Sequence, residues 1–109
     1  MHQTNVAELS RQLGETAATH SSRRAVATVY GDHGTALHQT VIALAAGAGL
    51  AEHESPGEAT LQVLSGHVRL VAGDRSWVGV AGDLLVIPPS RHGLEALADS
   101  VVLLTVARG

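Results

Sequence analysis

Histidine offers more chemistry than any other residue type in this chain, and two of its histidines stand in similar surroundings. His53 belongs to the segment Gly47-x5-His53-x-Ser55, and His92 follows Pro88 and a second proline. An imidazole can bind a divalent metal, carry a proton or accept a hydrogen bond near neutral pH. The chain has no cysteine, so any metal must be held by His, Asp or Glu. These two histidines are therefore the first candidates for a metal or ligand site.

Both histidines lie in stretches that alternate in the manner of β-strands, where every second side chain faces the same side. The side chains predicted to face inward in the first stretch are His53, Ser55, Ala59, Leu61 and Val63, and those predicted to face outward are Glu54, Glu58, Thr60 and Gln62. In the second stretch His92, Leu94 and Ala96 share the inward face. The alternation predicts that His92 lies close to His53.

The rest of the sequence predicts an all-β domain preceded by one short helix. Val6, Leu9 and Leu13 have helical spacing, Asn5-x-x-Glu8 forms a capping box, and Gly14 marks the predicted end of the helix. Beyond this helix, β-branched residues alternate with others between glycine-containing turns. Strands are predicted at 24–30, 35–45, 50–54, 59–65, 67–72, 75–81, 84–88, 92–97 and 100–107, with turns at 31–34, 66–67, 73–74 and 82–83.

Two glycine-anchored blocks of this sequence resemble the paired motifs of the cupin superfamily. In the first block Gly47, His53 and Gly66 are in register, whereas Ser55 and Ala59 occupy the second histidine and the glutamate positions. In the second block Gly82, Asp83 and Pro88 match, Ser90 stands at a glycine position, His92 comes one residue early, and Ala96 stands at the asparagine position. The resemblance implies an antiparallel cupin or jelly-roll-like β-barrel, with residues 1–22 as helix and linker and residues 23–109 as the barrel.

The same departures weaken the metal site that the family would have. Catalytic zinc usually keeps three protein ligands, and non-haem iron uses two histidines and one carboxylate. His53 and His92 are the retained ligands, His38 is the best candidate for a third, and Glu52 is another. Glu58 would face inward only if a β-bulge near Pro56 changed the alternation. The cofactor is thus either absent or a divalent metal such as Fe, Mn, Ni or Zn.

Small side chains at inward positions also indicate a pocket. Small barrels are either filled by their own side chains or hold one small ligand. The pocket is predicted to be bounded by His53, Ser55, Ala59, Leu61, Val63, Leu85, Ile87, His92 and Leu94. An apolar pocket with a few polar groups at its mouth is the general form of a small-molecule site. The alternative is that the barrel contracts and fills the space.

Composition excludes several other classes of protein. The chain has 109 residues, which is the length of one ordinary domain. Its formal net charge is −3, and it lacks the basic patch that nucleic-acid binding needs. The longest apolar run, 41–51, is about half of the ~20 residues of a membrane-spanning helix. No secretory signal is apparent. We therefore expect a cytoplasmic protein that binds neither nucleic acid nor membrane.

Three functions stay open at this point. The first is a cupin barrel that binds a small, mainly apolar molecule without strong catalysis. The second is a metal-dependent cupin enzyme, such as an oxygenase or isomerase, that uses His53 and His92. The third is a sensory or interaction module of a regulatory system. The resemblance also implies a homodimer, and outward apolar residues such as Leu64 and Val86 are the candidates for its contacts.

Overall fold

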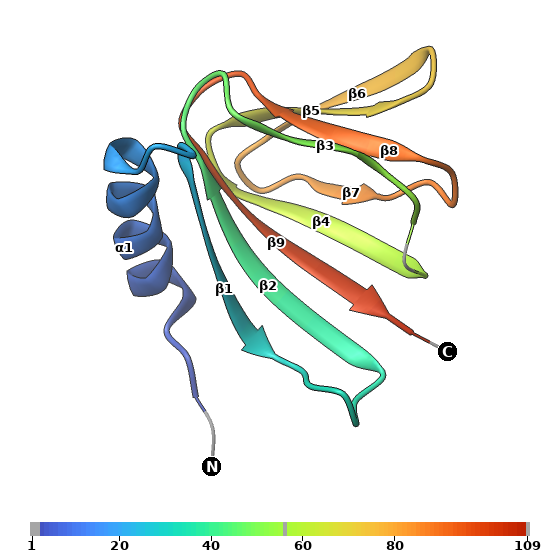
Figure 1. Ribbon diagram of the computed structural model, residues 1–109, viewed down its shortest axis with the longest axis horizontal. Helices are drawn as coiled ribbons and strands as arrows, with labels where there is room; N and C mark the ends of the chain where they lie inside the picture. The colour runs from blue at the N-terminus through green and yellow to red at the C-terminus, as the bar shows by residue number, and fades with distance from the viewer. Residues whose placement is uncertain (1–2, 56, 109) are drawn as a thin grey trace.

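The polypeptide folds into one helix and two antiparallel sheets, which form a jelly-roll-like barrel (Figure 1). This computed structural model describes residues 3–55 and 57–108. The larger sheet has the order β1-β2-β9-β4-β7, and the smaller sheet has the order β3-β8-β5-β6. The elements are α1 (Val6–Thr19), β1 (Arg24–Tyr30), β2 (Leu37–Leu44), β3 (Gly49–His53), β4 (Glu58–Ser65), β5 (His67–Ala72), β6 (Arg75–Val80), β7 (Leu84–Val86), β8 (His92–Ala96) and β9 (Ser100–Ala107). All nine predicted strands are present.

Two predicted strands are shorter in the structure by two or more residues. β2 begins at Leu37, because residues 31–36 form the connection that returns the chain from β1. β7 ends at Val86, since Pro88 and Pro89 cannot donate a ladder hydrogen bond. Only Ile87 extends the pairing, through its N–H, which donates to the carbonyl of Ala59 at 3.0 Å.

The core lies between the two sheets, and the alternation of each strand decides what enters it. In β2, Ile42 and Leu44 face the barrel interior, whereas Val41 and Ala43 face the opposite side. Buried residues of β4, β5, β8 and β9 complete the interior: Ala59, Leu61, Val63, Val68, Leu70, Leu94, Ala96, Val102 and Val106. The predicted inward set of β4 is therefore confirmed for Ala59, Leu61 and Val63.

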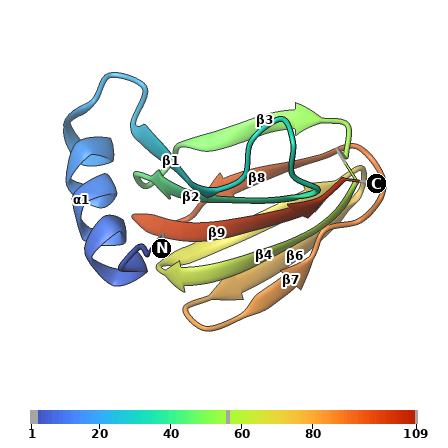
Figure 2. The ribbon, with the colours of Figure 1, turned by 90° about the horizontal axis from the view of Figure 1, so that it is seen from below.

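Helix α1 covers the outer face of the larger sheet (Figure 2). Its apolar side, with Leu9 and Leu13, packs on Val41 and Val101 of the sheet. Leu64 packs against this cluster and is only partly buried, so the helix of the same chain takes up part of the surface that was expected to form a subunit contact. Val86, by contrast, is 75% exposed.

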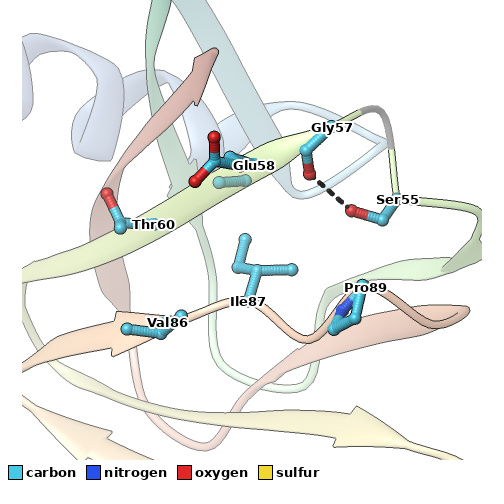
Figure 3. Close-up of a pocket in the computed structure, with 8 residues that line it drawn as sticks. Ser55, Gly57, Glu58, Thr60, Val86, Ile87 and Pro89 are labelled. Carbon is cyan, nitrogen blue, oxygen red and sulfur yellow. Dashed lines mark hydrogen bonds between the residues drawn. The ribbon is translucent and has the colours of Figure 1, made fainter. Parts of the chain in front are cut away.

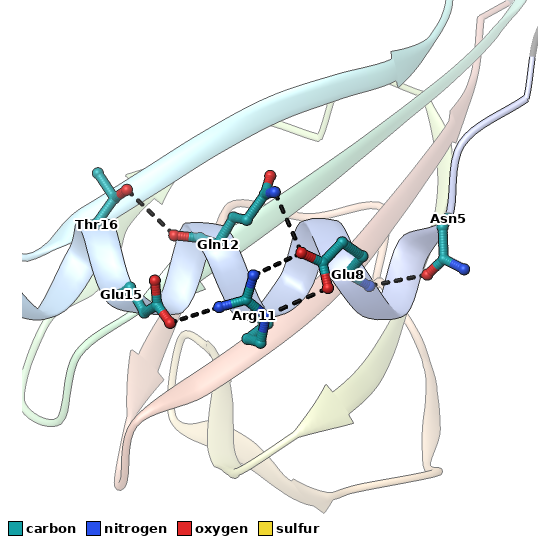
Figure 4. Close-up of polar contacts among 6 residues, drawn as sticks. All are labelled: Asn5, Glu8, Arg11, Gln12, Glu15 and Thr16. Atoms are coloured by element: carbon teal, nitrogen blue, oxygen red, sulfur yellow. Dashed lines mark hydrogen bonds and ion pairs between the residues drawn. The ribbon is translucent and has the colours of Figure 1, made fainter.

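Asn5 caps the N-terminus of α1, but the predicted capping box forms only in part, and the helix does not end at Gly14. Asn5 Oδ1 accepts the N–H of Glu8 at 2.9 Å, while the Glu8 carboxylate accepts from Arg11 and Gln12 (Figure 4). The helix runs on to Thr19 because Ala17, at 1% exposure, is buried against the sheet. This burial offsets the cost of a helical glycine, which is about 1 kcal/mol relative to alanine.

The ends of several strands meet at one end of the barrel, which we call the mouth. β3 ends there at His53, β8 begins at His92, β4 begins at Glu58, and β9 ends at Ala107 (Figure 1). The mouth is thus where the two predicted histidines lie. Within residues 3–55 and 57–108, the single helix is neither long nor apolar enough to cross a membrane.

Lowering the pH should loosen α1 before it unfolds the barrel. Hydrogen bonding and attraction from Arg11 hold the pKa of Glu8 below its ordinary value of 4.5. This stabilisation is complete above the ordinary value and is lost as the pH falls through the lower folded-state pKa. We expect hydrogen-exchange protection factors in α1 to fall over that range in the wild type and to stay flat in Glu8→Gln. Equal pH profiles for the two proteins would contradict a role for the Glu8–Arg11 pair in holding the helix.

Candidate functional site

The structure brings His53 and His92 together, as the alternation predicts. They are direct partners across the β3–β8 pair, and their ring centroids lie 4.6 Å apart with the planes at 59°. His92 is buried, at 4% exposure, whereas His53 lies on the edge strand and is exposed. One ring is thus set into the barrel and the other covers it from the mouth.

A β-bulge is what turns His53 towards His92. Leu50 pairs with Leu94, but His53 pairs with His92, so β3 carries one extra residue between these two pairs. In a regular strand, side chains three residues apart face opposite sides. The extra residue cancels this difference, and both Leu50 and His53 line the interior. The sequence analysis considered a bulge only near residue 56 and missed this one.

Gly93 makes the bulge possible. A side-chain β-carbon at this position would lie 3.0 Å from the carbonyl oxygen of Leu50 and 3.3 Å from the nitrogen of Glu52. The backbone of β3 therefore approaches β8 more closely than an alanine would allow. Leu50 and Gly93 are both parts of the site that the sequence analysis did not identify, although a glycine directly after a candidate ligand in a strand is a signal of close approach.

Backbone hydrogen bonds fix the tautomer of both imidazoles. Nδ1 of His53 lies 3.0 Å from the carbonyl of Ala51, and Nδ1 of His92 lies 2.9 Å from the carbonyl of Ser90. A carbonyl only accepts, so Nδ1 carries the proton in each ring. Nε2 is then the lone-pair atom of both neutral rings. The pair can accept hydrogen bonds from a ligand, and it has the tautomer that an Nε2-bound metal would require.

A small cavity adjoins the two rings. Its volume is about 30 Å³, enough for no more than about one or two water molecules. The walls are almost entirely apolar and come from both sheets: Ile42, Leu50, Leu61, Leu70, Ile87, Gly93, Leu94 and Leu104, with His53 and His92. The interior beside the two rings is therefore nearly filled by side chains, and the wall includes Ile42, Leu70 and Leu104, which were not predicted.

The predicted pocket is divided in the structure. His53, Leu61, Ile87, His92 and Leu94 line the cavity, as expected. Ser55 and Ala59 instead line a separate surface groove of about 460 Å³ (Figure 3). Val63 and Leu85 lie elsewhere in the interior, against Gly79 of β6. In this structure the nine residues therefore do not bound a single pocket, because the side chain of Ile87 stands between the cavity and the groove.

Ser55 has a structural role in this groove. Continuing the β4–β7 register beyond Ile87 would set Pro89 opposite Gly57, and a proline has no N–H to donate. The Ser55 hydroxyl donates to the carbonyl of Gly57 at 2.9 Å (Figure 3). The serine thus supplies the hydrogen bond that the strand cannot.

The other metal-ligand candidates are engaged elsewhere. His38 Nε2 lies 2.9 Å from the carbonyl of Thr35, and its ring lines a different groove, of about 780 Å³, beside the 31–36 connection. The carboxylate of Glu52 lies 3.6 Å from Arg91, which also bonds to the Glu52 carbonyl. His38 and Glu52 therefore do not complete a site with the histidine pair.

No group of three or more His, Asp or Glu side chains within residues 3–55 and 57–108 is arranged to hold a metal ion. Two imidazoles in an apolar setting are one ligand short of a catalytic zinc site and lack the carboxylate of a non-haem iron site. The donor set that this chain presents does not fit a resident catalytic metal.

Comparison with known proteins supports the fold. No protein-family model matches the sequence, and neither does any curated protein. Among solved structures, an RmlC-like cupin protein from Desulfovibrio desulfuricans is 28% identical, with a TM-score of 0.68 over 77% of this chain and 81% of that one. A conserved protein of unknown function from Streptococcus pyogenes is 25% identical, with a TM-score of 0.74 over 83% and 78%.

An enzyme also shares the fold. A variant of salicylate 1,2-dioxygenase from Pseudoaminobacter salicylatoxidans has a TM-score of 0.78 at 20% identity. The match covers 95% of this chain but only 34% of the enzyme. At this identity the likeness concerns the fold alone.

Gly93→Ala should separate the two histidine rings. The new methyl group would press on the β3 backbone at the bulge, and we expect a loss of about 1–3 kcal/mol in the free energy of unfolding. Nuclear Overhauser contacts between the rings of His53 and His92 should weaken or vanish. Gly14→Ala is the matched control: a β-carbon there meets nothing within 4 Å, so the contacts should stay. Unchanged contacts in Gly93→Ala would show that the bulge does not depend on glycine.

Ser55→Ala should leave the carbonyl of Gly57 without its hydroxyl partner. We expect a loss of about 1 kcal/mol in the free energy of unfolding, the usual net value of one hydrogen bond. Ser55→Thr keeps the hydroxyl and should retain most of that stability. Denaturant unfolding of the three proteins measures the difference. Equal losses in both variants would indicate a packing role for Ser55 instead.

Proposed function

We propose that this chain, a small cupin domain, binds a small and mainly apolar molecule at the histidine pair and does so without strong catalysis. The observation that carries the proposal is the shared tautomer of His53 and His92. Both rings donate Nδ1–H to the backbone, so each keeps Nε2 as its acceptor, and both residues line one apolar cavity. Small-molecule sites usually have apolar walls that carry only a few polar groups.

The size of the cavity limits how a ligand enters. About 30 Å³ does not accommodate an organic molecule, so binding requires the mouth to open. His53 is the exposed member of the pair and lies on an edge strand, which is the side where opening costs least. A ligand that carries one hydroxyl or N–H group could then donate to Nε2 while its apolar part replaces water.

The donor set argues against a metal-dependent reaction as the main activity. Catalysis of the oxygenase or isomerase type would need a third protein ligand, and His38 and Glu52 are both held in other contacts. The proposal therefore assigns the pair to hydrogen bonding of a ligand.

Replacing both histidines should abolish binding. In a thermal-shift screen of phenols, short alcohols and amines, we expect compounds that stabilise the wild type to lose their effect in the His53→Ala, His92→Ala double variant, because both acceptors are gone. His33→Ala, in the connection between β1 and β2, is the matched control and should respond like the wild type.

Two results would contradict the proposal. The first is a screen in which no compound stabilises the wild type. The second is near-stoichiometric Fe, Mn, Ni or Zn in protein purified after metal-supplemented growth, with the metal lost in the double variant. That second result would favour the metal-dependent enzyme.

A further inference from the structure

The surface groove and the histidine cavity share one wall residue, Ile87. The groove of about 460 Å³ is lined by Ser55, Gly57, Glu58, Ala59, Thr60, Val86, Ile87 and Pro89, and Ile87 is also in the wall of the cavity. Its side chain points towards β4, across the gap between β4 and residues 86–89 (Figure 3). Ile87 is 8% exposed, so it is the layer between solvent in the groove and the interior.

The side chain of Ile87 can move without breaking a hydrogen bond. The only hydrogen bond that ties Ile87 to β4 comes from its backbone N–H, and the apolar side chain forms none. Pro88 and Pro89 follow, and they leave the main chain beyond Ile87 unpaired with β4. A change of side-chain rotamer would therefore open the groove to the cavity without breaking a backbone hydrogen bond.

The two compartments have different chemistry. His53 and His92 line the cavity among apolar walls, and Nε2 is the acceptor atom of each ring. The groove has apolar sides in Val86 and Pro89, and Glu58 is the one ionisable residue among the eight that line it. A molecule that spans both would need a hydrogen-bond donor at its inner end, an apolar body, and a positive charge at its outer end.

We propose that groove and cavity are two halves of one site, that Ile87 divides them and sets its specificity, and that its ligand is a hydroxylated amine. The hydroxyl donates to the histidine pair, the apolar body takes the space that Ile87 vacates, and the ammonium lies beside Glu58. This inference rests on the proposed function, whose ligand it narrows to a chemical class.

A matched set of probes tests the assignment. Tyramine has the hydroxyl and the ammonium, 4-ethylphenol lacks the charge, and 3-(4-hydroxyphenyl)propionate reverses it. Affinities would be measured by calorimetry, and the imidazole resonances of His53 and His92 would report whether the hydroxyl reaches the pair. We expect tyramine to bind the wild type more tightly than either analogue and to shift both sets of resonances.

Three variants separate the halves of the site. Ile87→Ala should tighten tyramine and 4-ethylphenol alike by about tenfold, the effect of a few carbons in an apolar pocket. Ile87→Val, which disturbs packing less, should change both affinities in the same direction by a smaller factor. Glu58→Gln should weaken tyramine alone, by about two- to fivefold, because an exposed charge pair contributes little more.

The possible failures are distinct. Equal tyramine affinity in wild type, Ile87→Ala and Ile87→Val would overturn the role of Ile87. If 3-(4-hydroxyphenyl)propionate bound as tightly as tyramine, the amine assignment would be overturned. In both cases, shifts of the His53 and His92 imidazole resonances on adding 4-ethylphenol would leave the proposed function intact. Absence of any imidazole shift with all three probes, in the wild type and in folded Ile87→Ala, would overturn both proposals.

Discussion

Strand β9 is the constraint on which the rest of the barrel depends. It pairs with β2 on one side and with β4 on the other, almost along its whole length. Both of its faces are covered: Val102 and Val106 enter the barrel, while Val101 and Leu103 lie under α1. Leu104 reaches the wall of the histidine cavity. A shift of one residue in this strand would exchange the two faces and expose both clusters at once.

Much of this arrangement follows from short-range patterns in the sequence. Alternation and glycine-containing turns predicted all nine strands, and parity within β4 and β8 predicted which side chains enter the barrel. The meeting of His53 and His92 was also predicted from alternation, although in the structure the bulge in β3, which was not predicted, turns His53 inward. These features depend on periods of two residues, which a sequence displays directly.

The features that were not predicted depend on contacts between distant segments. The bulge in β3 follows from the close approach of Gly93, which lies far along the chain from β3, and no local pattern encodes this contact. The helix passes Gly14 because Ala17 finds a buried place on the sheet. The pocket is divided because Ile87 happens to fill the space beside Ala59, and the volume of a packed interior cannot be read from side-chain types alone.

Two residues at positions that differ from the cupin pattern have structural roles in this chain. Ser55 satisfies the carbonyl of Gly57, and Ala59 is a wall of both the core and the groove. The histidines that remain are held by the backbone rather than by carboxylates, which keeps their acceptor atoms available. The chain thus keeps the turns of the barrel, while Ser55 and Ala59 stand where the cupin pattern has metal ligands.

The proline pair after β7 has a consequence for the behaviour of the protein in concentrated solution. A free sheet edge is a template on which another chain can add a strand, and this is a common start of aggregation. β7 spans only Leu84–Val86 at the edge of the larger sheet, and its outward side chains are strongly apolar. The two prolines end this edge, so a strand of another chain could form very few backbone hydrogen bonds with it. The exposed apolar side chains of β7 are therefore not accompanied by the row of free backbone groups that strand addition requires.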